Sequence, residues 1–432
     1  MRKGKGEEKE FDWSTATFKK FLLKISYIGT NYAGLAHQLP SSSAPSSSEA
    51  VSAAENVPTV EGELMKAFLK TKLIKDVQSC GFSRCGRTDK GVHSSGNYVA
   101  LFLRTKPKPA HPDDHYNYAQ VINGVLPPDI RVLAFKPVPD DFDARFNCLR
   151  RVYKYFFVPF GMDLALMNQA AQHFVGEHDF RNFCKLDENV QHFTRRITSI
   201  VIEPCDANTA VATFTGTAFL WHQIRCMVSV LMLVGRGLEQ PSVIADLLDV
   251  DKHPQKPQYE LADPAGLVLF DCFFEGIHFD TSEHQQGPRR PADTFKDMYV
   301  NHVRNAAVCR CLAGVPSAPT GQPPQEASCA AFPGIQGMET ASHRPPARYR
   351  PLMDRPTSTS YDERLAKLRE KKRQTSQGKT ADMPVDGGDE RMEDGGGGKG
   401  TGKDEPVSDG DRDKDRGDVK RARTHEGSTG EG

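Results

Sequence analysis

A short charged stretch, Cys80–Val92 (CGFSRCGRTDKGV), contains the residue types expected around a catalytic carboxylate. Its acidic residue is Asp89, and Arg84, Arg87 and Lys90 lie close to it in the sequence. Neighbouring cations favour the ionised form of a carboxylate, which suits a nucleophile or an anion partner and does not suit a general acid. The same cations could contact phosphates. On composition alone, an ordinary glycine-rich turn explains the stretch better.

Two further segments combine basic residues with aromatic or apolar ones. Arg145–Phe157 (RFNCLRRVYKYFF) has four basic and five aromatic residues, a pattern typical of an amphipathic strand whose cations reach solvent. Phe219–Met227 (FLWHQIRCM) carries Arg225 on an otherwise apolar helix. Burying that charge is costly unless a carboxylate pairs with it, and the alternative is a guanidinium in solvent at the helix edge. For His222 we expect a packed or hydrogen-bonded side chain, with proton transfer as the alternative.

The segment Gly86–His93 (GRTDKGVH) resembles the signature loop of the TruA-type tRNA pseudouridine synthases, GRTDxGVxA. Ser94 stands where the family has alanine, which is a minor departure. The resemblance implies that Asp89 is the essential catalytic carboxylate. It also implies that Arg87 helps to extrude the target base and to hold the loop.

Three other motifs fit the same family. RVYKY matches its RxYxY segment, which implies that Tyr153 stacks on the target uracil, an interaction worth about 1–3 kcal/mol. HQIR matches the motif whose arginine faces the catalytic aspartate, which implies that Arg225 pairs with Asp89. AGLVL, at Ala265–Leu269, resembles the GLxL segment, so Leu267 is expected to line the base pocket, although a plain strand position explains it nearly as well.

Further segments resemble the eukaryotic branch of the family that modifies positions 38 and 39 of the tRNA anticodon stem-loop. They are Val175–Asp187, Lys252–Tyr259 and Tyr349–Arg364. The resemblance covers about residues 20–280 and the last of these segments. It implies an α/β (α+β) fold with two lobes, each a mostly antiparallel mixed sheet with helices, and a catalytic cleft between the lobes. tRNA is the implied partner, and a homodimer is a further expectation because family members often pair.

Pseudouridine formation breaks the N-glycosidic bond of uridine and rejoins the base through C5. Because the substrate carries both leaving group and acceptor, we expect no cofactor and no metal, and the sequence has no CxxC pair. Asp89 could attack C1′, add to the base at C6 or stabilise a developing cation. Leu267 would help to exclude water, and Arg84 and Lys90 would join Arg87 in contacting the RNA.

Two rival functions remain open from the sequence. One is a synthase of another TruA-type branch that acts elsewhere on tRNA, on small nuclear RNA or on mRNA. The other is a non-catalytic tRNA-binding or tRNA-folding protein on the same scaffold. The presence of Asp89, Tyr153 and Arg225 argues against the loss of catalysis.

Hydrophobic periodicity predicts the elements that must position these residues. Strands are expected at Phe21–Ile28, Tyr98–Leu103, Ile130–Pro137, Arg151–Pro159, Arg196–Glu203, Ala210–Phe214 and Leu267–Phe274. Helices are expected at Val60–Leu73, His115–Val125, Met162–Phe174, Thr217–Gly235 and Tyr361–Lys371.

Composition then divides the chain. We expect a polar extension (1–17), an N-terminal lobe with the Asp89 loop (18–145) and a low-complexity insertion (41–56), a C-terminal lobe (146–284), a disordered insertion (285–345), a short ordered segment (346–373) and a disordered charged tail (374–432).

The overall charge does not identify a partner. Lys plus Arg and Asp plus Glu both number 56, so the formal net charge is +0, and a basic face could balance an acidic tail. No run of 18 apolar residues occurs, so we expect no membrane association. Scattered cysteines and the lack of a signal peptide favour a reducing compartment, the nucleus and/or the cytoplasm.

Overall fold

A computed structural model of the chain describes residues 11–36, 58–111, 114–187, 190, 192–279, 291–313 and 348–379. The chain divides into two units, Met1–Arg373 and Gln374–Gly432, and all the described strands belong to the first. The insertion expected at 41–56 lies outside the described residues, as does most of the expected tail.

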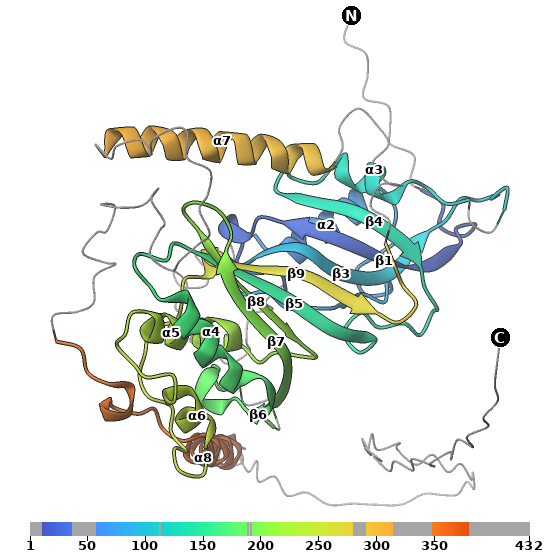
Figure 1. The fold of residues 1–432 in the computed structure, drawn as a ribbon. Coiled ribbons are helices and arrows are strands. Elements are labelled where there is room, and N and C mark those ends of the chain that lie inside the picture. Colours follow the sequence, from blue (N-terminus) through green and yellow to red (C-terminus); the bar gives the residue numbers. More distant parts are fainter. Residues whose placement is uncertain are drawn as a thin grey trace, which may run out of the picture. The chain divides into compact units, whose positions relative to one another are not determined.

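A single mixed sheet forms the centre of the first unit (Figure 1). Its strands, in chain order, are β1 (Phe18–Tyr27), β2 (Ser83–Arg84), β3 (His93–Arg104), β4 (Ile130–Pro137), β5 (Cys148–Phe157), β6 (Gly176–Asp179), β7 (Thr194–Pro204), β8 (Ala210–Gly216) and β9 (Leu267–Phe274). Their spatial order is β4-β1-β3-β9-β5-β8-β7-β6, and β2 pairs with β3. The mixed and mostly antiparallel sheet expected from the sequence is confirmed.

The two halves of the chain share this sheet instead of forming separate sheets. β3 pairs in parallel with β9 through His93–Val268 and Ser94–Leu269, and the other neighbouring strands are antiparallel. The expectation of one sheet in each lobe is therefore corrected to one continuous sheet. The sequence could not indicate the join, because the pairing of β3 with β9 connects residues about 175 positions apart.

Helices cover the two halves separately. In the N-terminal half, α2 (Val60–Lys70) and α3 (Tyr118–Asn123) bury one core with the odd-numbered residues of β1, from Phe21 to Tyr27. In the C-terminal half, α4 (Leu164–Ala171), α5 (Gln223–Gly235) and α6 (Val243–Leu248) bury a second core with β5, β7 and β8. Along each strand, every second side chain points into one of these cores, because successive side chains of a strand point to opposite faces of the sheet.

Helix α5 begins later than the sequence suggests. The apolar pattern predicts a helix from Thr217, but the helix starts at Gln223, and His222 before it adopts a left-handed conformation with φ 62°. Periodicity cannot detect such a break, since the residues from Thr217 to Trp221 are apolar enough to continue the pattern. Among the described helices, none is both long and apolar enough to cross a membrane.

The described part of the expected disordered insertion contains a helix. Residues Pro291–Leu312 form α7, whose side chains are largely exposed. Its sequence holds no glycine and no internal proline, and it has Asp293 in its first turn, features that permit a helix without a packed face. The expectation was based on the Gly- and Pro-rich composition around this stretch, so it is corrected for 291–312.

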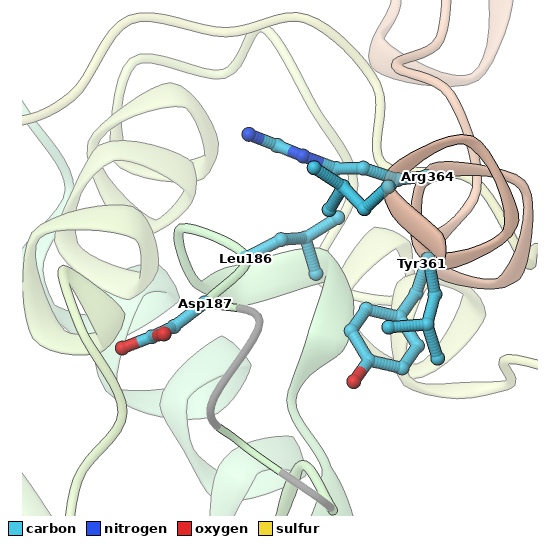
Figure 2. Close-up of a pocket in the computed structure, with 6 residues that line it drawn as sticks. Leu186, Asp187, Tyr361 and Arg364 are labelled. Atoms are coloured by element: carbon cyan, nitrogen blue, oxygen red, sulfur yellow. The ribbon is translucent and has the colours of Figure 1, made fainter. Parts of the chain in front are cut away.

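The C-terminal segment docks on the C-terminal half of the sheet. Leu352 is fully buried in that core, and Glu239 accepts hydrogen bonds from the Tyr349 hydroxyl and the Leu352 N–H at 2.5 and 2.6 Å. Helix α8 (Tyr361–Lys379) follows. Tyr361, Arg364, Leu365 and Leu368 of α8 line a small pocket with Leu186 and Asp187 of the loop after β6 (Figure 2).

Candidate active site

The Asp89 loop connects β2 to β3 and is held by the side chain of Asn97. Asn97 is fully buried, and its amide donates to the Gly86 carbonyl at 2.8 Å while its oxygen accepts from the Gly86 N–H at 3.2 Å. The Cys85 N–H donates to the Tyr98 carbonyl at 2.8 Å. The start of the loop is thus fixed to β3 by a side chain for which the sequence offered no signal.

The first strand and the turn after it support the loop from the other side. The hydroxyls of Tyr27 and Thr88 lie 2.8 Å apart, and the Leu35 N–H donates to the Thr88 carbonyl at 3.1 Å. Gly34 has φ +107°, and a Cβ atom there would lie 2.6 Å from the Thr88 oxygen. A side chain at position 34 would therefore displace the loop that carries Asp89.

Ser94 joins the end of this loop to β9. Its hydroxyl donates to the Leu269 carbonyl at 2.9 Å, and the residue is 3% exposed. The serine that replaces the alanine of the family motif is therefore hydrogen-bonded where an alanine could not be, so this departure strengthens the contact between β3 and β9.

The carboxylate of Asp89 faces the residues just before α5. His222 Nε2 lies 3.6 Å from Asp89 Oδ2, and the Trp221 side chain hydrogen-bonds to the Asp89 carboxylate. Burial, followed by the charges of Arg225 and Lys185, lowers the pKa of His222 to about 4. His222 is therefore neutral at pH 7, and its approach to Asp89 is a polar contact and not an ion pair.

Arg225 and Lys185 act on Asp89 through their charges. The Arg225 Nε donates to the Ala262 carbonyl at 2.7 Å, and no salt bridge joins Arg225 to Asp89 among the described residues, so the pairing that the motif implied is replaced by a longer-range charge interaction. Lys185 Nζ lies 3.9 Å from the centre of the Trp221 ring. Lys185 and Trp221 were not among the site residues expected from the sequence, although both lie in segments that resemble the family.

Burial decides the direction in which the pKa of Asp89 moves. It raises this pKa above the ordinary value of 3.8, and the charges of Arg225, Lys185 and Arg87, with the Trp221 hydrogen bond, oppose it. The cations thus act in the direction that the sequence predicts, but they do not fully compensate for the loss of water around the carboxylate.

Aromatic and aliphatic side chains of β5 and β9 form a wall beside the loop. Tyr153 on β5 is 8% exposed and contacts the Phe219 ring edge to face, with centroids 5.1 Å apart. A Cβ atom on Gly86 would lie 2.9 Å from Leu269 and 3.7 Å from the Tyr153 hydroxyl. Leu267 is buried two residues before Leu269 on β9.

The basic residues Arg84, Arg87 and Lys90, in and just before the Asp89 loop, differ in their surroundings. Arg84 pairs with Glu61 at 3.1 Å, on the N-terminal half. Arg87 is exposed, and its charge acts on Asp89. Lys90, the residue that follows Asp89 in the sequence, is also exposed. The charges of Arg87 and Arg225 therefore act on Asp89, Tyr153 lies beside Gly86 at the start of the loop, and Arg84 is directed to an acidic partner elsewhere.

Comparison with known proteins identifies the chain as an RNA-modifying isomerase of the pseudouridine synthase class. The family model described as tRNA pseudouridine synthase matches residues 170–275. The tRNA pseudouridine(38/39) synthase of Bos taurus is 35% identical over 400 residues, which cover 83% of this chain and 78% of that protein. Its Homo sapiens counterpart is 33% identical, with 84% and 79% covered. The Saccharomyces cerevisiae enzyme is 40% identical over 284 residues, with 63% and 61% covered. The chain belongs to the tRNA pseudouridine synthase family, as its motifs predict.

The raised pKa of Asp89 leads to a prediction about stability. A carboxyl group whose pKa is higher in the folded than in the unfolded state costs folding free energy once it is ionised. We expect Asp89→Asn to raise the melting temperature at neutral pH, and the gain to vanish below the ordinary aspartate pKa. Thermal unfolding from acid to neutral pH measures this. Asp206→Asn, in an exposed turn, is the control. A melting temperature for Asp89→Asn that falls below wild type at neutral pH would contradict the prediction.

Proposed function

We propose that this enzyme isomerises uridine to pseudouridine at positions 38 and 39 of the tRNA anticodon stem-loop. The observation that carries the proposal is the similarity along most of the chain to proteins named for these positions. The segment around Leu352, which resembles the same branch of the family, is built into the core and adds support. Action at other tRNA, small nuclear RNA or mRNA sites is not favoured by these relatives.

Asp89 is the catalytic carboxylate in this proposal. It is the acidic residue toward which Arg225, Lys185 and Arg87 direct their charges, and its ionised form is required for attack at C1′, for addition at C6 and for stabilising a developing cation. His222 is neutral at pH 7 and so adds no charge of its own to the carboxylate. The Trp221 indole orients the carboxylate.

Tyr153 and the apolar residues beside it hold the target base. Burial raises the pKa of Tyr153 far above its ordinary value, so the ring stays neutral and presents a face for stacking. Such stacking helps to offset the cost of unstacking the uridine. Leu267 and Leu269 exclude water, which would otherwise compete with the detached base for C1′ of the ribose. Asp89 needs neither metal nor cofactor for this chemistry, because both reacting fragments come from the uridine.

Exposed cations around the site bind the RNA backbone. Arg87, Lys90 and Lys185 are exposed near Asp89, and phosphate contacts by such residues position an RNA without reading its sequence. Because Arg84 is paired with Glu61, we expect Arg84 to contribute less to tRNA binding than Arg87. We place the enzyme in the nucleus or cytoplasm, where its described cysteines, all free, stay reduced.

Substitution of the carboxylate tests the assignment directly. We expect Asp89→Asn to bind tRNA about as well as wild type and to lose pseudouridine formation by several orders of magnitude, because the amide cannot act as a nucleophile. Tritium release from labelled tRNA measures the activity, and pseudouridine mapping in cells that carry only the variant identifies the sites. Asp206→Asn should retain full activity. Unchanged modification by Asp89→Asn would refute the catalytic role, and loss confined to other positions would refute the site assignment.

The charge of Arg225 should control the pH dependence of the reaction. Activity requires ionised Asp89 and falls as the pH drops through its pKa, which burial raises. Arg225 lowers that pKa, so Arg225→Gln should move the acid limb of the rate profile to higher pH. Single-turnover rates from pH 4 to 8 measure the shift. Lys66→Gln, which removes an exposed charge on α2, is the control. An acid limb that does not move would exclude electrostatic coupling.

We further propose that the enzyme is a homodimer that pairs through the exposed face of β5 and β9. Phe156, Phe270 and Phe273 are 38, 42 and 36% exposed there, an unusual concentration of aromatic surface. Cations cover two of the rings: Arg150 lies 4.1 Å from the centre of Phe273, and Lys154 lies 4.2 Å from the centre of Phe270. A second copy would bury this apolar surface.

Light scattering after gel filtration should give twice the chain mass for wild type and the single chain mass for Phe270→Glu. The glutamate would place a charge in the apolar interface, which is costly without a partner. Phe18→Glu, at the equally exposed 43% on β1, should remain dimeric. A monomeric wild type would overturn this part of the proposal.

A further inference from the structure

Three cysteines from distant parts of the sequence meet beneath the Asp89 loop. The sulfur atoms of Cys85, Cys148 and Cys272 all lie within 4.8 Å of one another. Cys85 and Cys272 are 4 and 3% exposed, and Cys148 is half-buried. We propose that these three residues, as thiolates, bind one soft metal ion, Zn²⁺, in a site that is separate from the catalytic carboxylate.

The strand register disfavours one of the three possible disulfides, the one between Cys148 and Cys272. Cys148 pairs with Phe274 across β5 and β9, so Cys272 stands two residues further along, on the diagonal. Diagonal residues of an antiparallel pair have Cα atoms about 7–8 Å apart, whereas a disulfide requires less than about 7 Å. Zinc–sulfur bonds of about 2.3 Å place ligand sulfurs roughly 3.8 Å apart. The three thiols need only small movements to reach that spacing.

A buried arginine supplies the charge that such a site requires. Arg151 is 8% exposed and interacts electrostatically with all three cysteines. It is held in place by hydrogen bonds to the carbonyls of Thr217, Cys85 and Arg145 at 2.6, 3.1 and 3.0 Å, and no carboxylate forms an ion pair with it among the described residues.

Three thiolates and one divalent cation carry a net charge of −1, which Arg151 neutralises. A monovalent ion would leave a buried negative charge, which is costly. This balance favours a divalent ion over a monovalent one, and Zn²⁺ is a divalent ion that binds thiolates well.

The site would connect the three segments that build the active site. Cys85 precedes the Asp89 loop, Cys148 begins the strand of Tyr153, and Cys272 lies on the strand of Leu267. A metal there would hold these segments together without taking part in the reaction. The spacing of 63 and 124 residues between the ligands gave no sign of a site in the sequence.

Metal titration of the full chain tests the proposal. Protein purified with a phosphine reductant is stripped with a chelator and titrated with Zn²⁺, and bound zinc is counted by atomic emission. Cd²⁺ serves as a second probe through its sulfur-to-metal absorption band. We expect one ion per chain and a higher melting temperature with zinc. Cys148→Ser should weaken binding by at least about tenfold, since a neutral hydroxyl replaces a thiolate ligand.

Cys80→Ser is the matched control, because Cys80 is as buried as Cys85, at 4%, but lies outside the cluster. It should bind zinc as wild type does. Cys85→Ser provides a second ligand variant, and circular dichroism checks that each variant folds. Three results would overturn the proposal: no stoichiometric zinc in wild type, equal binding by Cys148→Ser, or a disulfide within the cluster in reduced, metal-supplied protein.

Discussion

The parallel pairing of β3 with β9 is the contact on which the rest of the structure depends. It joins two halves that each have their own core, and the Ser94 hydroxyl reinforces it by bonding to the Leu269 carbonyl. The Asp89 loop ends where β3 begins, so this pairing brings the loop beside the wall formed by β5 and β9. Without it, Asp89 and Tyr153 would belong to separate bodies.

Burial and neighbouring charges have opposite effects on the pKa of Asp89. Removing water from Asp89 raises its pKa, and the cations around it limit the rise without ion pairs of their own to the carboxylate. The arrangement leaves the carboxylate free for substrate, since a direct bidentate pair with Arg225 would occupy its oxygens. It also accounts for the neutral His222, because the same cations and the same burial disfavour an imidazolium.

Local sequence signals predicted which strands and helices form better than they predicted the residues at which these elements begin and end. Strands β4 and β9 begin and end where their apolar patterns indicate, at Ile130–Pro137 and Leu267–Phe274. Helix α5 begins six residues late and α7 was not expected, because a left-handed residue and an exposed helix leave no trace in hydrophobic periodicity. The one continuous sheet was also missed, since strand neighbours across 175 residues depend on packing.

The sequence by itself determined the family, the candidate carboxylate and the aromatic and basic residues expected around it. Short motifs carry this information, and they can be recognised without knowing which residues lie close together in space. Only the tertiary structure decided that Arg84 pairs with Glu61, that Trp221 and Lys185 approach Asp89, and that three scattered cysteines share one volume. The physical reason is that hydrogen bonds, charge interactions and metal coordination act over a few ångströms in space. The number of residues between two positions does not indicate how far apart they lie in space until the pairing of the strands is known.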